Sequence, residues 1–248
     1  MVMLTLFYNW TMIYVCSDIH GCFSEFKCLL ETVDFKDEDT MYILGDVLDR
    51  GEEPIALLQY VMSKDNIVLL KGNHENDAFL LLTALVNSID DVSVKSHLSM
   101  DLYKVISTWV SENGGGPTLK QFMDLDNDER HRILEYLHNL DVYKLISVNG
   151  RNYLLSHTFN DELYDENKSL SDYDESCFVY GYIDFDNCYL KDTYHITGHV
   201  PVQLTRSDKQ ALILEYKNHI NIDCGMVYGG RLSCICLDNN RHYYIGEN

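Results

Sequence analysis

Basic side chains are scarce in this chain of 248 residues. Its 19 Lys and Arg residues face 39 Asp and Glu residues, which gives a formal net charge of −20. Binding to nucleic acid or to an anionic membrane requires a basic surface that neutralises phosphate groups. The composition therefore excludes general nucleic-acid binders and membrane-surface proteins, and we expect no nucleic-acid partner and no membrane partner.

The chain also lacks long hydrophobic runs and paired cysteines of the zinc-binding type. The apolar start, Met1–Val15, is interrupted by Asn9 and Thr11, is too short to span a bilayer, and has no basic region or small-residue cleavage site of a secretory signal. None of the eight cysteines forms a C-x-x-C pair, which disfavours structural zinc. We expect free thiols, a reducing environment and a cytoplasmic location.

Linker-like sequence is missing as well. Only three prolines are present, and hydrophobic and charged residues make up an ordinary 46% and 23% of the chain. No repeat or low-complexity tract divides the sequence. We expect one domain over residues 1–248, with residues 1–11 as an N-terminal extension.

Strand and helix patterns alternate in the front half. The expected strands are Met12–Cys16, Met41–Leu44 and Ile67–Leu70. One helix is expected between the first two strands, with Ser24 as its N-cap, and another from Pro54 to about Met62. This alternation predicts parallel strands joined by right-handed crossovers.

The middle of the chain is predicted to be helical and the back half to consist of strands. The expected helices are Glu75–Val86, Leu102–Val110 and Asp128–Leu140. A hairpin of Val142–Val148 and Tyr153–Ser156 is expected around Asn149-Gly150, a pair typical of type I′ turns. Further strands are expected at Tyr194–Thr197, Ala211–Tyr216, Ile220–Asp223 and Leu232–Leu237. We interpret residues 161–192, with ten acidic residues and two lysines, as a solvated, mobile surface insertion.

Polar clusters follow the first three expected strands. They read Asp18-Ile19-His20-Gly21, Gly45-Asp46-Val47-Leu48-Asp49-Arg50-Gly51 and Gly72-Asn73-His74-Glu75. Any one of these clusters alone is more often a turn or a helix cap than a functional site. Three clusters at the ends of consecutive parallel strands, however, should meet at one edge of the sheet. Their carboxylates, imidazoles and amide oxygen suit manganese, iron or zinc. His157 and His199 also follow expected strands and offer two more imidazoles.

Taken together, these motifs resemble the PPP-type metallophosphoesterases. The similarity is greatest to the short bacterial and phage serine/threonine protein phosphatases, including the lambda-phage type. It also includes Asn113-Gly114-Gly115-Gly116 and Ile222-Asp223-Cys224-Gly225, and spans roughly Met12 to Leu237. The resemblance implies an α/β calcineurin-like fold, in which two mixed β-sheets pack as a sandwich flanked by helices.

The resemblance also implies a set of ligands for two divalent metal ions, with manganese as the first expectation and iron or zinc as alternatives. One metal would be held by Asp18, His20 and Asp46. The second would be held by Asp46, Asn73, His157 and His199, with Asp46 bridging the two.

Three further roles follow from the same resemblance. Arg50, Asn73 and His74 would bind the substrate phosphate, and His74 would be the general acid, oriented by Asp49. A hydroxide bridging the two metals would attack phosphorus directly.

Members of the family usually carry a second phosphate-binding arginine between the last two histidine ligands, but residues 158–198 contain none. Lys168 and Lys191 are replacements only as point charges, so we expect weaker phosphate binding or slower turnover.

Three functions remain open at this point. The first is a metal-dependent serine/threonine phosphatase acting on a phosphoprotein or phosphopeptide. The alternative is a symmetrical dinucleoside tetraphosphate hydrolase, and the third is a non-catalytic phosphoprotein-binding module. The acidic surplus favours a basic or neutral phosphopeptide over a polyanionic nucleotide. The sequence carries no signal of oligomeric state.

Overall fold

Two mixed β-sheets form the centre of the molecule. The computed structural model describes residues 11–90, 100–184 and 190–246. The first sheet has the order β10-β9-β1-β2-β3, with β1 (Ile13–Cys16), β2 (Thr40–Ile43), β3 (Ile67–Leu69), β9 (Leu232–Cys236) and β10 (Arg241–Ile245). The second has the order β4-β5-β6-β8-β7, with β4 (Tyr143–Val148), β5 (Arg151–Ser156), β6 (Thr193–Thr197), β7 (Leu214–Tyr216) and β8 (His219–Asn221). In the first sheet β1, β2 and β3 are parallel, and in the second β5, β6 and β8 are parallel.

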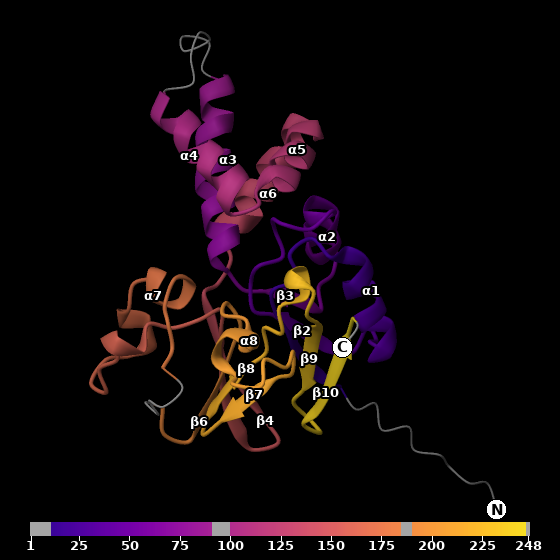
Figure 1. Cartoon of the computed structure of the whole chain (residues 1–248), viewed down its shortest axis with the longest axis vertical. Coiled ribbons are helices and arrows are strands. Elements are labelled where there is room, and N and C mark those ends of the chain that lie inside the picture. The colour runs from indigo at the N-terminus through magenta and orange to yellow at the C-terminus, as the bar shows by residue number, and fades with distance from the viewer. Residues whose placement is uncertain (1–10, 91–99, 185–189, 247–248) are drawn as a thin grey trace, which may run out of the picture.

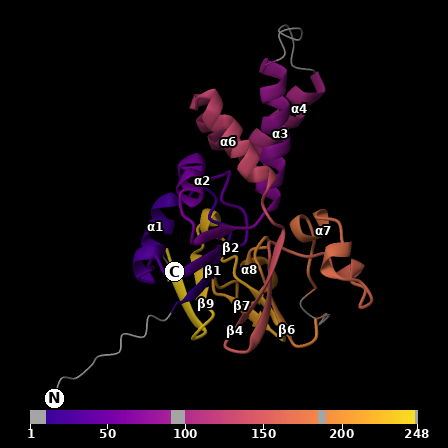
Figure 2. The same cartoon turned by 180° about the vertical axis from the view of Figure 1, so that it is seen from behind.

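Helices lie outside the sheets (Figures 1 and 2). The longer ones are α1 (Phe23–Thr32), α2 (Pro54–Met62), α3 (Asn73–Asp90), α4 (Met100–Glu112), α5 (Gly116–Asp124) and α6 (Asn127–His138). Short turns complete the set: α7 (Ser176–Val179), α8 (Val202–Thr205), η1 (Asp161–Leu163), η2 (Leu170–Asp172) and η3 (Met226–Tyr228). Helices α3 to α6 rise together as an arm above the sheets (Figure 1). Within the described residues, no helix combines the length and apolar character needed to cross a membrane.

The strands of the first sheet bury side chains on both faces. Val15 and Ile235 point toward the second sheet and pack with Ile196. Tyr14 and Cys16, the neighbours of Val15, point the other way into a core with the helices. This alternation follows from the two-residue period of a strand, and burial of each large apolar side chain contributes roughly 1.5–3 kcal/mol. The predicted sandwich of two mixed sheets flanked by helices is confirmed.

Most expected elements are confirmed to within a few residues. The hairpin turn has φ of 50° at Asn149 and 79° at Gly150, as a type I′ turn requires. Ser24 was wrong as an N-cap: α1 begins at Phe23 and has no side-chain cap, and the Ser24 hydroxyl donates to Glu25.

Neither α5 nor β10 was predicted from the sequence, nor were the short helical turns α7, α8, η1, η2 and η3. The helix α5 begins at Gly116, directly after Asn113-Gly114-Gly115, and Pro117 lies in its first turn, a position that proline favours. The edge strand β10 carries polar residues among its tyrosines, and its structure depends on antiparallel pairing with β9.

The acidic segment 161–192 is more than a solvated insertion. Phe159, Phe178 and Ile183 form a buried apolar cluster with Cys177, and the Phe178 ring packs on Tyr143 of β4, 4.9 Å between centroids. Most acidic side chains of its described part are exposed, as expected. The interpretation as a wholly solvated segment is therefore wrong, because its aromatic side chains anchor it to the second sheet.

A buried histidine pair makes the second sheet sensitive to acid. His195 on β6 and His219 on β8 are register partners, with ring centroids 5.8 Å apart. Burial lowers the pKa of His219 from 6.5 to about 4, and the ammonium of Lys217 adds to the shift. Between these two pH values the unfolded chain binds a proton that the folded chain does not, so stability falls as pH falls.

We predict that His219→Gln reduces this loss. Between pH 7 and pH 5, the free energy of unfolding should fall by about 2 kcal/mol less in the variant than in the wild type. Urea unfolding at both pH values measures the difference. His131→Gln on the exposed surface of α6 is the matched control, and an equal acid-induced loss in the wild type and His219→Gln would contradict the prediction.

Candidate metal centre

The predicted site residues gather where strands of both sheets end. Asp18 and His20 follow β1, Asp46 follows β2, and Asn73 opens α3 directly after β3. His157 follows β5 and His199 follows β6. The structure therefore brings together residues from five strand ends, as expected for parallel strands.

Unusual backbone conformations hold these loops. Six of the site residues have positive φ without being glycine: Asp18 (52°), His20 (48°), Asp46 (57°), Asp49 (67°), Arg50 (67°) and His199 (72°). Each such residue costs of the order of 1 to 3 kcal/mol and persists only where the surroundings fix it. Gly45 has φ of 93°, and a Cβ there would lie 2.6 Å from Gly72 Cα, so the loops after β2 and β3 touch through glycines.

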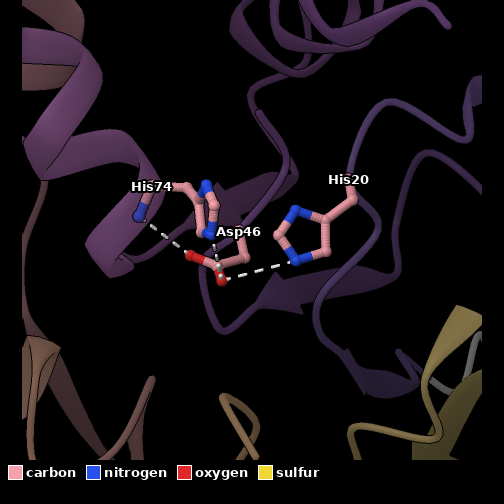
Figure 3. Close-up of side chains that lie close together, drawn as sticks. All are labelled: His20, Asp46 and His74. Carbon is pink, nitrogen blue, oxygen red and sulfur yellow. Dashed lines mark hydrogen bonds and ion pairs between the residues drawn. The ribbon is translucent and has the colours of Figure 1, made fainter. Parts of the chain in front are cut away.

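The first cluster of candidate ligand atoms contains His20, Asp46 and His74 (Figure 3). His20 Nε2 lies 3.5 Å from Asp46 Oδ2, and His74 Nε2 lies 3.9 Å from the same oxygen. His20 Nδ1 lies 2.8 Å from the Leu48 carbonyl oxygen. Because a carbonyl only accepts, Nδ1 carries the ring proton and Nε2 presents a lone pair toward Asp46.

The second cluster contains Asp46, His157 and His199, with Asn73 among them. His157 Nδ1 donates to the Leu44 carbonyl oxygen at 2.7 Å, so its Nε2 presents a lone pair. That Nε2 lies 2.9 Å from Asn73 Oδ1, 3.0 Å from His199 Nδ1 and 3.5 Å from Asp46 Oδ1. The candidate ligand atoms of Asn73, His199 and Asp46 therefore all lie within 3.5 Å of His157 Nε2.

Burial makes a cation the natural partner of both clusters. It raises the pKa of Asp46 well above its usual range, and the charges of Asp18 and Glu75 add to this shift. It lowers the pKa of His20 well below its usual range and that of His199 to about 3. Neutral imidazoles beside a buried carboxylate are the donor set that divalent metals prefer, and a cation would favour the ionised carboxylate. Asp46 directs Oδ2 to one cluster and Oδ1 to the other, so the residues present fit two divalent metals.

Asp18 lies beside the clusters but belongs to neither. Its carboxylate accepts a hydrogen bond from the Ser17 hydroxyl, and its Oδ2 lies 3.1 Å from the backbone N–H of His199. Gly198 permits this approach, because a Cβ there would overlap the Asp18 carboxylate. Asp18 thus joins the loop after β1 to the loop after β6, and its role as a metal ligand stays a prediction.

His74 and Asp49 form a buried hydrogen-bonded pair beside the first cluster. His74 Nδ1 lies 2.7 Å from Asp49 Oδ2. Burial alone lowers the pKa of His74, but the Asp46 charge and the Asp49 hydrogen bond outweigh it, and the net pKa is raised. The raised pKa favours the protonated imidazole, which is the state that the predicted general acid requires.

Two supports of this pair were missed in the sequence. Trp109 Nε1 donates to Asp49 Oδ2 at 2.7 Å, and the Thr118 hydroxyl donates to Asp49 Oδ1 at 2.6 Å. The Asn113–Gly116 stretch was the available signal: Gly115 packs so closely on the Trp109 indole that a Cβ would lie 2.2 Å from it.

Glu75 was also underestimated, because in the sequence it reads as part of a helix cap. Its carboxylate is fully buried and accepts hydrogen bonds from the backbone N–H groups of Asp46, Val47, Leu48 and Gly72. It therefore ties the loop that carries Asp46 to the start of α3.

Arg50 borders the first cluster on the solvent side. Its Nη1 lies 2.6 Å from His20 Nε2, and its guanidinium lies 5.2 Å from the centroid of the Tyr228 ring. Residues 158–198 contain no arginine in place of the family's second phosphate-binding arginine, and Tyr180 of this segment contacts the start of α3. The Tyr180 hydroxyl donates to Asp77 Oδ1 at 2.5 Å in the first turns of α3. Lys168 lies over the Tyr173 ring.

Similar proteins point to phosphate chemistry. A bis(5'-nucleosyl)-tetraphosphatase, symmetrical, of Wigglesworthia glossinidia brevipalpis is 31% identical over 109 residues, which are 43% of this chain and 39% of that protein. A protein of the same name from Buchnera aphidicola subsp. Acyrthosiphon pisum (strain Tuc7) is 42% identical over 64 residues, 25% of this chain and 23% of its own. The chain thus matches less than two fifths of the length of these curated relatives.

Solved structures share the fold along nearly the whole chain. A putative diadenosine tetraphosphatase has a TM-score of 0.62 at 16% identity and covers 97% of this chain and 96% of its own. A protein serine/threonine phosphatase of Saccharomyces cerevisiae has a TM-score of 0.51 at 15% identity and covers 96% and 80%. At these identities the likeness shows the fold alone.

The family itself is shown by a longer match. The sequence profile described as "Calcineurin-like phosphoesterase" matches residues 11–203, which include all six predicted ligands together with Asp49, Arg50 and His74. This chain therefore belongs to the calcineurin-like phosphoesterase family, as a metal-binding hydrolase of phosphoester bonds.

Proposed function

We propose that this phosphoesterase hydrolyses symmetrical dinucleoside tetraphosphates. The observation that carries the proposal is the similarity to curated relatives that bear this activity in their names, at 31% to 42% identity over the matched segments. It favours the alternative reading of the sequence over the protein phosphatase reading. The partly buried Arg50, next to the first cluster, supports it by offering a guanidinium to a polyphosphate.

The site chemistry of this proposal requires two divalent metals, with manganese first and iron or zinc as alternatives. Asp18, His20 and Asp46 would hold one metal. Asp46, Asn73, His157 and His199 would hold the other. Bound metals at such a site supply Lewis acidity and activate water.

The protein side chains have separate tasks in this scheme. Arg50 forks onto phosphate oxygens and orients the group that is attacked. Asn73 and His74 contact the same group, and His74 gives a proton to the oxygen that leaves. Asp49, fixed by Trp109 and Thr118, keeps the imidazole oriented for that transfer.

A serine/threonine protein phosphatase is the second candidate, and the His74–Asp49 pair is the observation that favours it. A serine alkoxide is a strong base and needs a proton to leave, whereas a nucleoside diphosphate is a much weaker base. The buried His74–Asp49 pair, in which the pKa of His74 is raised, therefore assists the hydrolysis of a phosphomonoester more than that of a dinucleoside tetraphosphate. A phosphopeptide would be the substrate and partner in that case.

A substrate panel separates the two candidates. We predict manganese-dependent hydrolysis of diadenosine tetraphosphate to adenosine diphosphate, with a kcat/KM at least tenfold above that for a basic phosphoserine peptide. Chromatography of the products with and without manganese measures both. A reversed preference would establish the second candidate, and hydrolysis of neither compound would refute both.

Substitutions at the centre should separate metal binding from proton transfer. Asp46→Asn removes the bridging carboxylate, and we predict that both metals are lost from the purified protein. His74→Asn should keep the metals and lower kcat on a phosphoserine peptide by about 10²–10⁴-fold. Elemental analysis and initial rates give the two readouts, with Asp128→Asn on exposed α6 as control. Loss of metal from His74→Asn would contradict its role as the acid.

The missing arginine can be restored at the rim of the site. Tyr180 lies between the proposed ligands His157 and His199 in the sequence and contacts the first turns of α3, so we choose it as the position for an arginine. We predict that Tyr180→Arg raises kcat/KM about tenfold, since a charged hydrogen bond to phosphate contributes about 1.5–3 kcal/mol. Tyr182→Arg is a parallel variant, because that side chain is also exposed. No gain in either variant on several phosphoesters would show that a second arginine is not what limits the enzyme.

A further inference from the structure

A hollow of about 540 Å³ lies beside Arg50, outside the two metal clusters. Its wall comes from three segments that are distant in sequence: α8, the loop before β7, and the turn η3 with the residues that follow it. Lys209, Tyr228, Gly229 and Arg231 are among the residues that line it. No residue of this wall is a predicted ligand or catalytic group.

The hollow carries positive charge in a strongly acidic protein. Lys209 and Arg231 line it, and the described residues of its wall include no Asp or Glu. The whole chain has 39 acidic and 19 basic side chains. A wall whose charged side chains are all basic therefore differs from the composition of the chain. Phosphate groups are the common ligands of such a surface.

Tyr228 gives the hollow an aromatic face. The side chain is 65% exposed and lies at the end of η3, next to Gly229 with φ of 80°. An ideal Cβ on Gly229 would meet no atom within 4 Å, so the backbone next to Tyr228 is open. An exposed tyrosine by itself is ordinary, but this ring is in contact with the guanidinium of Arg50, 5.2 Å from its centroid.

The Arg50 side chain connects the hollow to the metal centre. Its Nη1 lies 2.6 Å from His20 Nε2, while its guanidinium contacts Tyr228. A ligand that extends from the first cluster past Arg50 therefore reaches the Tyr228 ring and the hollow that Lys209 and Arg231 also line. A nucleotide offers a group for each of these features, because its phosphates pair with cations and its flat base stacks on an aromatic ring.

We propose that this hollow is a nucleoside-diphosphate subsite, in which Tyr228 stacks on the base while Lys209 and Arg231 neutralise the phosphates. The physiological ligand of the subsite rests on the proposed function, since each half of a symmetrical dinucleoside tetraphosphate is a nucleoside diphosphate. The subsite explains how the protein distinguishes a nucleotide from a phosphopeptide, which has no base to stack.

Calorimetric titration of the manganese-loaded protein tests the subsite without relying on turnover. The probes are adenosine diphosphate and inorganic pyrophosphate, which share the diphosphate group and differ in the nucleoside. The wild type should bind adenosine diphosphate about tenfold more tightly than pyrophosphate, because the stacking of one base accounts for a difference of this size. Tyr228→Ala should abolish this preference, and Tyr228→Phe should keep it. Lys209→Glu should weaken adenosine diphosphate binding about tenfold, and Tyr103→Ala on exposed α4 is the control.

The outcomes distinguish the subsite from the proposed function. Equal affinity of the wild type for both probes, or a preference that survives Tyr228→Ala, overturns the subsite even if diadenosine tetraphosphate is hydrolysed. A preference that disappears in Tyr228→Ala supports the subsite. If the same protein then fails to hydrolyse diadenosine tetraphosphate, only the proposed substrate is wrong.

Discussion

The geometry of the metal centre depends on the buried carboxylate of Glu75. It accepts backbone N–H groups from Asp46 at 2.7 Å, Val47 at 2.9 Å, Leu48 at 3.2 Å and Gly72 at 3.0 Å. An isolated buried carboxylate is very costly, and hydrogen bonds to a charged acceptor, each contributing about 1.5–3 kcal/mol, offset that cost. The loop after β2 therefore cannot move relative to the start of α3 without leaving Glu75 unpaired, and the relative position of Asp46 and Asn73 is set before any metal binds.

Backbone strain in the surrounding loops is the counterpart of that constraint. Asp46, Asp49 and Arg50 all have positive φ in the loop that Glu75 holds, and a relaxed loop would turn their side chains elsewhere. The hydrogen bonds to Glu75, and that from Arg50 N–H to the Gly114 carbonyl at 2.8 Å, stabilise this conformation. The positive φ values thus lower local stability while they orient three functional side chains toward the same place, as is common in strained active-site loops.

The parts of the fold that the sequence predicts well are those with local causes. The strands β1, β2 and β3 and the clusters behind them could be read directly, since a buried run followed by a polar turn is contained within ten residues. Trp109 and Thr118 could not be found in this way, because they meet Asp49 across 60 and 69 residues through the packing of α4 and α5. The role of Glu75 was hidden for a related reason: its helix-cap position is visible in the sequence, but three of its four partners lie in a different loop.

Net charge is a weak guide to the ligand, because it is a sum that carries no information on where the charges lie. The exposed acids in the described part of residues 161–192 line neither the metal clusters nor the basic hollow, and at physiological salt the effect of an exposed charge is screened over about 8 Å. Nearer the centre, Asp18, Asp46 and Asp223 are buried and would be balanced by cations, while Arg50 and the proposed Lys209–Arg231 subsite face an incoming ligand. The total of −20 therefore does not argue against a polyanionic nucleotide, because a sum over the whole chain does not describe the charges that line the site.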